Sequence, residues 1–110
     1  MTTKDQIKQD IAEYKEWIAF AKSLKDLKNN KAFKTVILEG YTKNEVINGV
    51  HSLSLPDVRS NEALEANILR RINAVSDLVE YMRLVELRGY QSEQDLALAE
   101  EELTKIEFEE

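Results

Sequence analysis

Residues 61–107 decide the fold of this 110-residue chain, and they read NEALEANILRRINAVSDLVEYMRLVELRGYQSEQDLALAEEELTKIE. Apolar residues recur along this stretch at alternating spacings of four and three, and Arg71 is the one charged residue in their register. The apolar members of the register are Leu64, Ile68, Val75, Leu78, Met82, Val85, Leu96, Ala99, Leu103 and Ile106. A heptad phase that lasts this long predicts a long helix that packs along another helix.

The weakest part of this stretch is 89–92, where Gly89 and Ser92 occupy register positions. Because the heptad phase is the same on both sides, the pattern favours one continuous helix over 61–107. Such a helix would be about 70 Å long at 1.5 Å per residue. The alternative is a bend or a break near 89–92, where glycine weakens the helix.

A second apolar seam lies near the other end of the chain, within residues 5–28. Its members follow the same alternating spacing, and they are Ile7, Ile11, Tyr14, Ile18, Ala21, Leu24 and Leu27. Aspartates lie early in this stretch and lysines late, which complements the helix dipole. The pattern predicts a first long helix over 5–28, with Asn29 and Asn30 as its stop.

Residues 31–60 predict a compact section of short helices, which we call the knob. A first short helix is expected to end at Gly40, in a left-handed C-cap. Thr42 and Glu45 have the spacing of a capping box, which predicts that a new short helix begins there. The stretch 54–60 is the one convincing loop.

Together these patterns predict an all-α fold of a single domain over 1–110. The economical arrangement is an antiparallel hairpin of two coiled-coil-like long helices with the knob between them. The first helix would pack against roughly 85–106, and the knob against 64–82. The rival arrangement pairs the same seams between chains, in a dimer or a larger assembly.

The net charge is −6, and it is unevenly distributed. Every lysine except Lys105 lies between Lys4 and Lys43, and all five arginines lie between Arg59 and Arg88. From residue 90 onward there are eight acids and one base. This balance argues against a protein that binds the nucleic-acid backbone, since such a protein needs a positively charged contact face.

Cysteine is absent, which excludes disulfides and thiolate sites. No apolar run of about 18 residues exists, so neither a membrane-spanning helix nor a membrane partner is expected. The first residues lack the apolar stretch of a signal peptide. We therefore expect the chain to be cytoplasmic where it is made.

No catalytic, metal-binding or cofactor-binding residues are expected. His51 is the only histidine and no G-x-S-x-G motif lies near it, so a place at a helix end suits it better than catalysis or a pH switch. The glutamates of 100–110 lack the alternating Asp/Asn oxygens and the turn glycine of a calcium loop, and are interpreted as a solvated helix face. Gly40 and Gly49 do not form a phosphate-binding loop.

Arg70 and Arg71 belong to a loose cluster of arginines that also includes Arg59, Arg83 and Arg88. Arginine suits bidentate contact with a carboxylate or a phosphate. The main expectation is an ion pair within the chain, with Glu62, Glu65 or Asp77. Contact with a partner protein and contact with nucleic acid are the alternatives.

Trp17 and Phe20 lie beside the apolar seam of the first helix rather than in it. Such a helix has two faces to bury. One face is the intramolecular core, and the other is predicted to be an outward contact surface, because aromatic residues are enriched in interfaces. The alternative is a broader core, in which this helix meets two neighbours.

The segment 33–41 reads FKTVILEGY, and Glu45 and Val46 follow it. This segment resembles a group of small proteins, most without an assigned role, that tailed bacteriophages encode among genes for virion structure and head assembly. In these proteins a first helix leads into an F-x-x-x-I-x-x-G-Y-like segment, and a long Glu- and Ala-rich helix closes the chain. The polar stretch 44–51 departs from that pattern, which leaves the packing of the knob open.

The resemblance implies a setting in the virion, reached through the host cytoplasm during assembly. It carries no catalytic residues. Within the knob, the residues that it implies to be structural are Phe33, Ile37, Gly40 and Tyr41.

We therefore expect a non-enzymatic structural or assembly component of a phage particle, which contacts copies of itself or other phage structural proteins and forms homo-oligomers. The residues expected at protein contacts are Trp17, Phe20, Phe33, Ile37, Tyr41, Arg70 and Arg71. The alternative is a small acidic phage-encoded inhibitor of a host nucleic-acid-processing protein. A nucleic-acid packaging factor that uses the arginines comes third, and an enzyme comes last.

Overall fold

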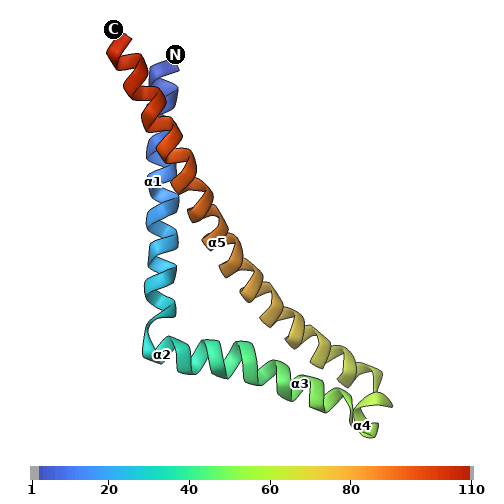
Figure 1. Cartoon of the computed structure of the whole chain (residues 1–110). Helices are drawn as coiled ribbons and strands as arrows, with labels where there is room; N and C mark the ends of the chain where they lie inside the picture. The colour runs from blue at the N-terminus through green and yellow to red at the C-terminus, as the bar shows by residue number, and fades with distance from the viewer. Residues whose placement is uncertain (1–2, 110) are drawn as a thin grey trace. The chain divides into compact units, whose positions relative to one another are not determined.

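The computed structural model describes residues 3–109, and over that range the protein is all-α, as the sequence predicts (Figure 1). The two long helices are α1 (Thr3–Lys28) and α5 (Glu62–Glu109). The shorter elements between them are α2 (Lys31–Phe33), η1 (Lys34–Asn44), α3 (Glu45–Leu53) and α4 (Pro56–Arg59). The chain divides into two compact units: unit 1 holds the residues up to Lys25 and those from Arg83 onward, and unit 2 is Asp26–Met82.

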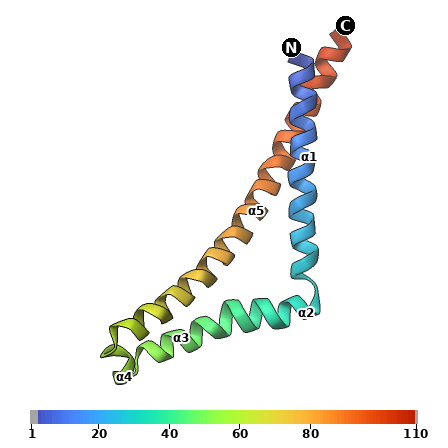
Figure 2. The same ribbon diagram turned by 180° about the vertical axis from the view of Figure 1, so that it is seen from behind.

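Unit 1 is an antiparallel pair made of α1 and the C-terminal part of α5, which lie side by side in both views (Figures 1 and 2). One contact and one electrostatic influence give the direction. Ala21 lies against Gly89, whereas Tyr14, nearer the N-terminus, is influenced by the charge of Asp95. Because the residue numbers fall along α1 as they rise along α5, the two helices run in opposite directions. The predicted helical hairpin is confirmed.

The seam between these helices follows the predicted spacing over most of its length. Ile7 and Val85 are buried, and the predicted members of α1 from Ile11 to Leu24 are half-buried. Leu27 is the exception, since its side chain is 46 % exposed. The seam on α1 therefore ends about one turn before the predicted position.

The helix α5 runs without a break through 89–92. Gly89 and Ser92 are both buried. A Cβ atom at Gly89 would overlap the Cβ of Ala21, so the missing side chain lets the two helix backbones approach closely. The packing gained at this contact offsets the roughly 1 kcal/mol that a glycine costs inside a helix.

In unit 2, residues 31–53 form an unbroken helical run rather than two short helices. Asn30 begins the run, because its side-chain oxygen accepts the backbone N–H of Phe33 at 3.0 Å. The run winds as a π-helix over η1 and returns to α-helical winding at α3. The predicted stop at Asn29 and Asn30 thus separates α1 from this run.

The two boundary signals predicted inside the knob are wrong. Gly40 has no positive φ and lies within η1, so it does not cap a helix. The hydroxyl of Thr42 donates to the carbonyl of Leu38 one turn earlier, so it does not cap a helix either. Glycine and threonine are compatible with a helix interior where helix-forming residues flank them, and here the helix continues through both.

The stretch 54–60, predicted as a loop, contains the single helical turn α4. Pro56 begins this turn at the position where its missing N–H costs nothing, and the side chain of Val58 is buried. Asn61 then begins α5, because its side-chain oxygen accepts the backbone N–H of Leu64 at 3.1 Å.

At the start of α5 the predicted register is wrong at two positions and holds at Ile68. Leu64 and Arg71 are exposed, whereas Ile68 and Ile72 are half-buried. A Cβ atom at Gly49 of α3 would lie 3.1 Å from two atoms of the Ile72 side chain and 3.5 Å from Ile68. The apolar face of α5 is thus turned toward α3 here, and Ile72 takes the place that the heptad phase gives to Arg71.

Candidate interaction surfaces

Unit 1 carries an aromatic cluster made of Trp17, Phe20 and Arg88. The two rings meet edge to face, with centroids 5.9 Å apart and an interplanar angle of 85°. The guanidinium carbon of Arg88 lies 4.6 Å from the centroid of the Trp17 ring, which is cation–π geometry. Through this cluster, the Arg88 side chain of α5 packs on the Trp17 ring of α1.

The aromatic cluster has one covered side and one open side. Arg88 covers the half-buried Trp17, whereas half of the Phe20 side chain is exposed. Glu13 and Glu16 line a surface depression together with the two rings. An exposed ring with carboxylates beside it suits a protein partner that offers apolar and basic side chains.

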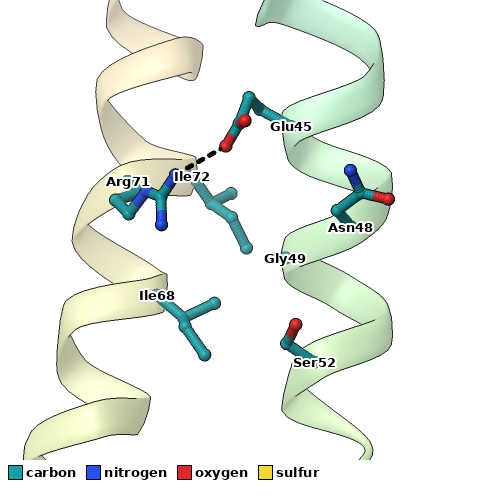
Figure 3. Close-up of a pocket in the computed structure, with 7 residues that line it drawn as sticks. All are labelled: Glu45, Asn48, Gly49, Ser52, Ile68, Arg71 and Ile72. Carbon is teal, nitrogen blue, oxygen red and sulfur yellow. Dashed lines mark hydrogen bonds and ion pairs between the residues drawn. The ribbon is translucent and has the colours of Figure 1, made fainter.

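Unit 2 contains a crevice between α3 and the first part of α5 (Figure 3). Its floor is apolar because Gly49 leaves room for Ile68 and Ile72. Its rim is polar, and an ion pair closes one end, where a guanidinium nitrogen of Arg71 donates to a carboxylate oxygen of Glu45 at 2.9 Å (Figure 3).

The size of this crevice limits what it can bind. Its volume is about 180 Å³, below the roughly 300 Å³ at which pockets for drug-sized ligands begin. The Arg71 side chain is 67 % exposed and that of Glu45 is 43 % exposed, so the ion pair is hydrated and contributes little stability. We interpret the crevice as a helix-packing contact with a charged rim.

Tyr41 lines a neighbouring depression with Glu45, Arg71 and Ala74. Tyr41 and the ion pair of Arg71 with Glu45 therefore line the same depression on unit 2. Arg70, the adjacent arginine, is exposed.

The structure brings together two pairs of the residues predicted at protein contacts, one pair in each unit. Trp17 and Phe20 touch each other in unit 1, and Tyr41 and Arg71 share a depression in unit 2. Phe33 and Ile37 are half-buried on the helical run that also carries Tyr41.

The predicted partner of Arg71 is wrong. Glu62, Glu65 and Asp77 lie on its own helix, whereas the structure pairs Arg71 with Glu45, 26 positions away in the chain. The expectation also placed Arg71 on the helix seam, but the half-buried Ile72 occupies that face. Two further contact residues were missed: Arg88 over Trp17, and Glu45 itself. Each pairing joins residues on two different helices, so the spacing of residues along a single helix does not predict it.

Residues considered for other chemistry lie on the surface. His51 is exposed in the last turn of α3, as predicted. The glutamates of α5 from Glu100 to Glu102 are also exposed. Within residues 3–109, no three acidic or histidine side chains are grouped so that they could hold a metal ion. None of the described helices has the length and apolar character needed to cross a bilayer.

Comparison with protein-family models, with curated proteins and with solved structures finds no match for this chain.

Proposed function

We propose that this protein is a non-enzymatic structural or assembly component of a bacteriophage particle, and that it acts through contacts between helix faces. The phage setting rests on the resemblance of 33–41 to small proteins of virion and head-assembly gene modules. The mode of action rests on the distribution of apolar surface in the folded chain. It would act in the host cytoplasm during assembly and then in the virion.

The main observation in support of the proposal is that few hydrophobic side chains are buried while many are exposed. Among the described residues, five hydrophobic side chains are buried, whereas fifteen large hydrophobic side chains are at least 40 % exposed. Burial of apolar surface stabilises by about 25 cal/mol per Å², so association is the direct way for such a surface to gain stability. These exposed apolar side chains are available for contacts with the helices of other chains, which is what supports the proposal.

Isolation of particles and assembly intermediates tests the proposal. The chain, carrying an affinity tag, is expressed in cells infected by the phage that encodes it, and both fractions are purified and analysed by quantitative mass spectrometry. We expect a fixed ratio of the chain to a major head protein in at least one fraction, retained after a high-salt wash. Absence from both fractions would contradict the proposal.

The acidic-inhibitor alternative gains one supporting observation and meets one difficulty. The carboxylates of Glu100, Glu101 and Glu102 are exposed, so they are available to a basic groove. Because these residues are consecutive on a helix, they point in directions about 100° apart and do not form one acidic face. Salt-sensitive capture of a host nuclease or polymerase, with no chain in either particle fraction, would favour this alternative.

A further inference from the structure

The C-terminal part of α5 carries a second heptad stripe that faces away from α1. Its members are Leu84, Leu87, Gln91, Gln94 and Leu98, which we call the outer stripe. All five side chains are exposed, and that of Leu98 is 66 % exposed. At 100° per residue, the outer stripe lies about 140° around the helix from the seam that contacts α1. An alternating spacing of three and four is the pattern of a coiled-coil contact.

Charge is segregated along the same part of the helix. Its beginning holds Arg83, Glu86 and Arg88 and is net positive, whereas from residue 93 onward the acids outnumber the one base, Lys105. Two copies of α5 in parallel would place acid against acid along most of this length. Two antiparallel copies would place the arginine-bearing half of each against the acidic half of the other.

We propose that the outer stripe is a self-association surface, on which a second copy of this chain packs its own α5 antiparallel. The two-fold axis passes between Gln91 and Gln94. This register brings Leu87 of one copy to Leu98 of the other. This inference rests on the proposed function, because it names a second copy as one partner of the helix faces.

The flanking charges agree with this register. Arg88 and Asp95 lie on the same flank of the outer stripe, seven residues apart. In an antiparallel pair, equivalent flanks of the two helices meet, so Asp95 of each copy lies beside Arg88 of the other, whose guanidinium stays over its own Trp17 ring. The side-chain nitrogen of Gln94 donates to the hydroxyl of its own Tyr90 at 2.8 Å, which keeps the centre of the stripe polar. Polar residues at the centre of a helix contact fix its register.

Crosslinking tests the direction of packing. The chain contains no cysteine, so Leu87→Cys and Leu98→Cys each introduce one unique thiol. The two variants carry tags of different mass, are mixed, and are treated with a bis-maleimide that spans less than about 10 Å. In the proposed register, two copies of residue 87 lie eleven positions apart, or about 16 Å along the helix. We expect crosslinks between the two variants and few within either; crosslinks of each variant to itself would overturn the proposal.

Sedimentation equilibrium tests the surface itself. Leu98→Glu adds a charge to the acidic half of the outer stripe, and Val36→Glu is the matched control because its side chain is 64 % exposed and lies in unit 2. We expect a concentration-dependent dimer that Leu98→Glu weakens by at least tenfold, or about 1.4 kcal/mol, and that Val36→Glu leaves unchanged. Circular dichroism of both variants verifies that the helices persist.

The outcomes separate this inference from the proposed function. A chain that is monomeric at all concentrations, or that dimerises equally well with Leu98→Glu, overturns the outer stripe as a self-association surface, even if the chain is present in particles. A dimer with the expected crosslinks and no chain in particles or intermediates overturns the proposed function alone.

Discussion

The two units of this protein each contain a helix contact centred on a glycine, but the neighbours of the two glycines differ. In unit 1, Gly89 faces the Cβ of Ala21, which is fixed to the backbone of α1. In unit 2, Gly49 faces the side chains of Ile68 and Ile72, whose nearest atoms lie further from a Cβ at that position. The first contact is a close approach of two helices, whereas the second is a side-chain contact.

This difference predicts how the two units respond to added volume. A Cβ atom that meets another Cβ atom forces two helices apart, because neither atom can move without its backbone. A Cβ atom 3.1 Å from Cδ1 and Cγ1 of Ile72 requires that side chain to move by only a few tenths of an ångström. Unit 1 is therefore expected to be the more sensitive to substitution at its glycine, although both glycines lie inside helices.

Gly89→Ala is expected to give the largest effect. The new Cβ overlaps that of Ala21, and overpacking of this kind costs about 1–3 kcal/mol. The gain of roughly 1 kcal/mol in helix propensity offsets only part of this cost. We expect the free energy of unfolding to fall by about 1 kcal/mol, measured by urea denaturation followed by circular dichroism.

A compensating substitution at the facing residue sharpens this prediction. Ala21→Gly removes the Cβ that is overlapped, so the double variant should be more stable than the sum of the two single effects predicts, by about 1 kcal/mol or more. Additive effects would show that the two helices do not approach closely at this point.

A double-mutant cycle between Trp17 and Arg88 tests a second contact of unit 1. The guanidinium lies 4.6 Å from the ring centroid, and exposed cation–π pairs contribute about 0.5–1 kcal/mol. We expect a coupling of that size from urea denaturation of Trp17→Leu, Arg88→Ala and the double variant. A coupling close to zero would mean that Arg88 does not rest on the indole ring in solution.

Much of the fold follows from local patterns in the sequence. The alternating spacing from Ile7 to Leu24 predicts the seam of α1, and Asn30 marks the boundary that follows it. Gly40 was misleading because a glycine is a stop signal only when its φ is positive, and here the helix continues. The heptad phase is wrong at residue 71 because Ile72 supplies the apolar contact with α3, whereas Arg71 pairs with Glu45 at its rim.

The candidate surfaces were less predictable, because they depend on contacts between distant parts of the chain. Trp17 and Phe20 lie three positions apart on one helix, and their proximity follows from that spacing. Arg88 over Trp17 and Arg71 beside Glu45 depend instead on how helices pack against one another. The outer stripe is visible in the sequence as an alternating spacing of three and four. The heptad seam predicted for α5 is only the stripe that contains Val85 and Leu96.

The ion pair of unit 2 is expected to contribute less than the contacts of unit 1. Arg71 and Glu45 are both exposed, and exposed pairs contribute about 0.2–1 kcal/mol. A double-mutant cycle with alanine at both positions should give a coupling of about 0.5 kcal/mol at low salt, which decreases at high salt. The pair of Lys105 and Glu101, 3.5 Å apart in α5, is a matched control from unit 1 with an expected coupling of about 0.3 kcal/mol.

Tyr14 makes the stability of unit 1 depend on pH in the alkaline range. Partial burial raises the pKa of its hydroxyl above the ordinary value, and the negative charges of Asp10, Asp95 and Glu13 raise it further. The pKa is higher in the folded chain than in the unfolded chain. The contribution of the protonated Tyr14 hydroxyl to the stability of the fold is therefore complete below pH 10 and is lost as the pH rises above 10. We expect the stability of the parent to fall more steeply above pH 10 than that of Tyr14→Phe, as measured by urea denaturation across that range. If the stability of the parent and that of Tyr14→Phe fell equally steeply with pH, the pKa of Tyr14 would not be raised by folding.

Gly49→Ala should give the smallest effect of the series and so completes the comparison between the units. The added Cβ lies 3.1 Å from the nearest atoms of Ile72, which costs little if that side chain rotates. The helix-propensity gain of roughly 1 kcal/mol acts in the opposite direction, so the net change in the free energy of unfolding is expected within about 0.5 kcal/mol of zero. Ile72→Val in the same background removes one of the crowded atoms and should make the substitution at residue 49 stabilising. If Gly49→Ala destabilised the protein as much as Gly89→Ala, the crevice of unit 2 would be a rigid close approach as well, and the distinction between the two contacts would be lost.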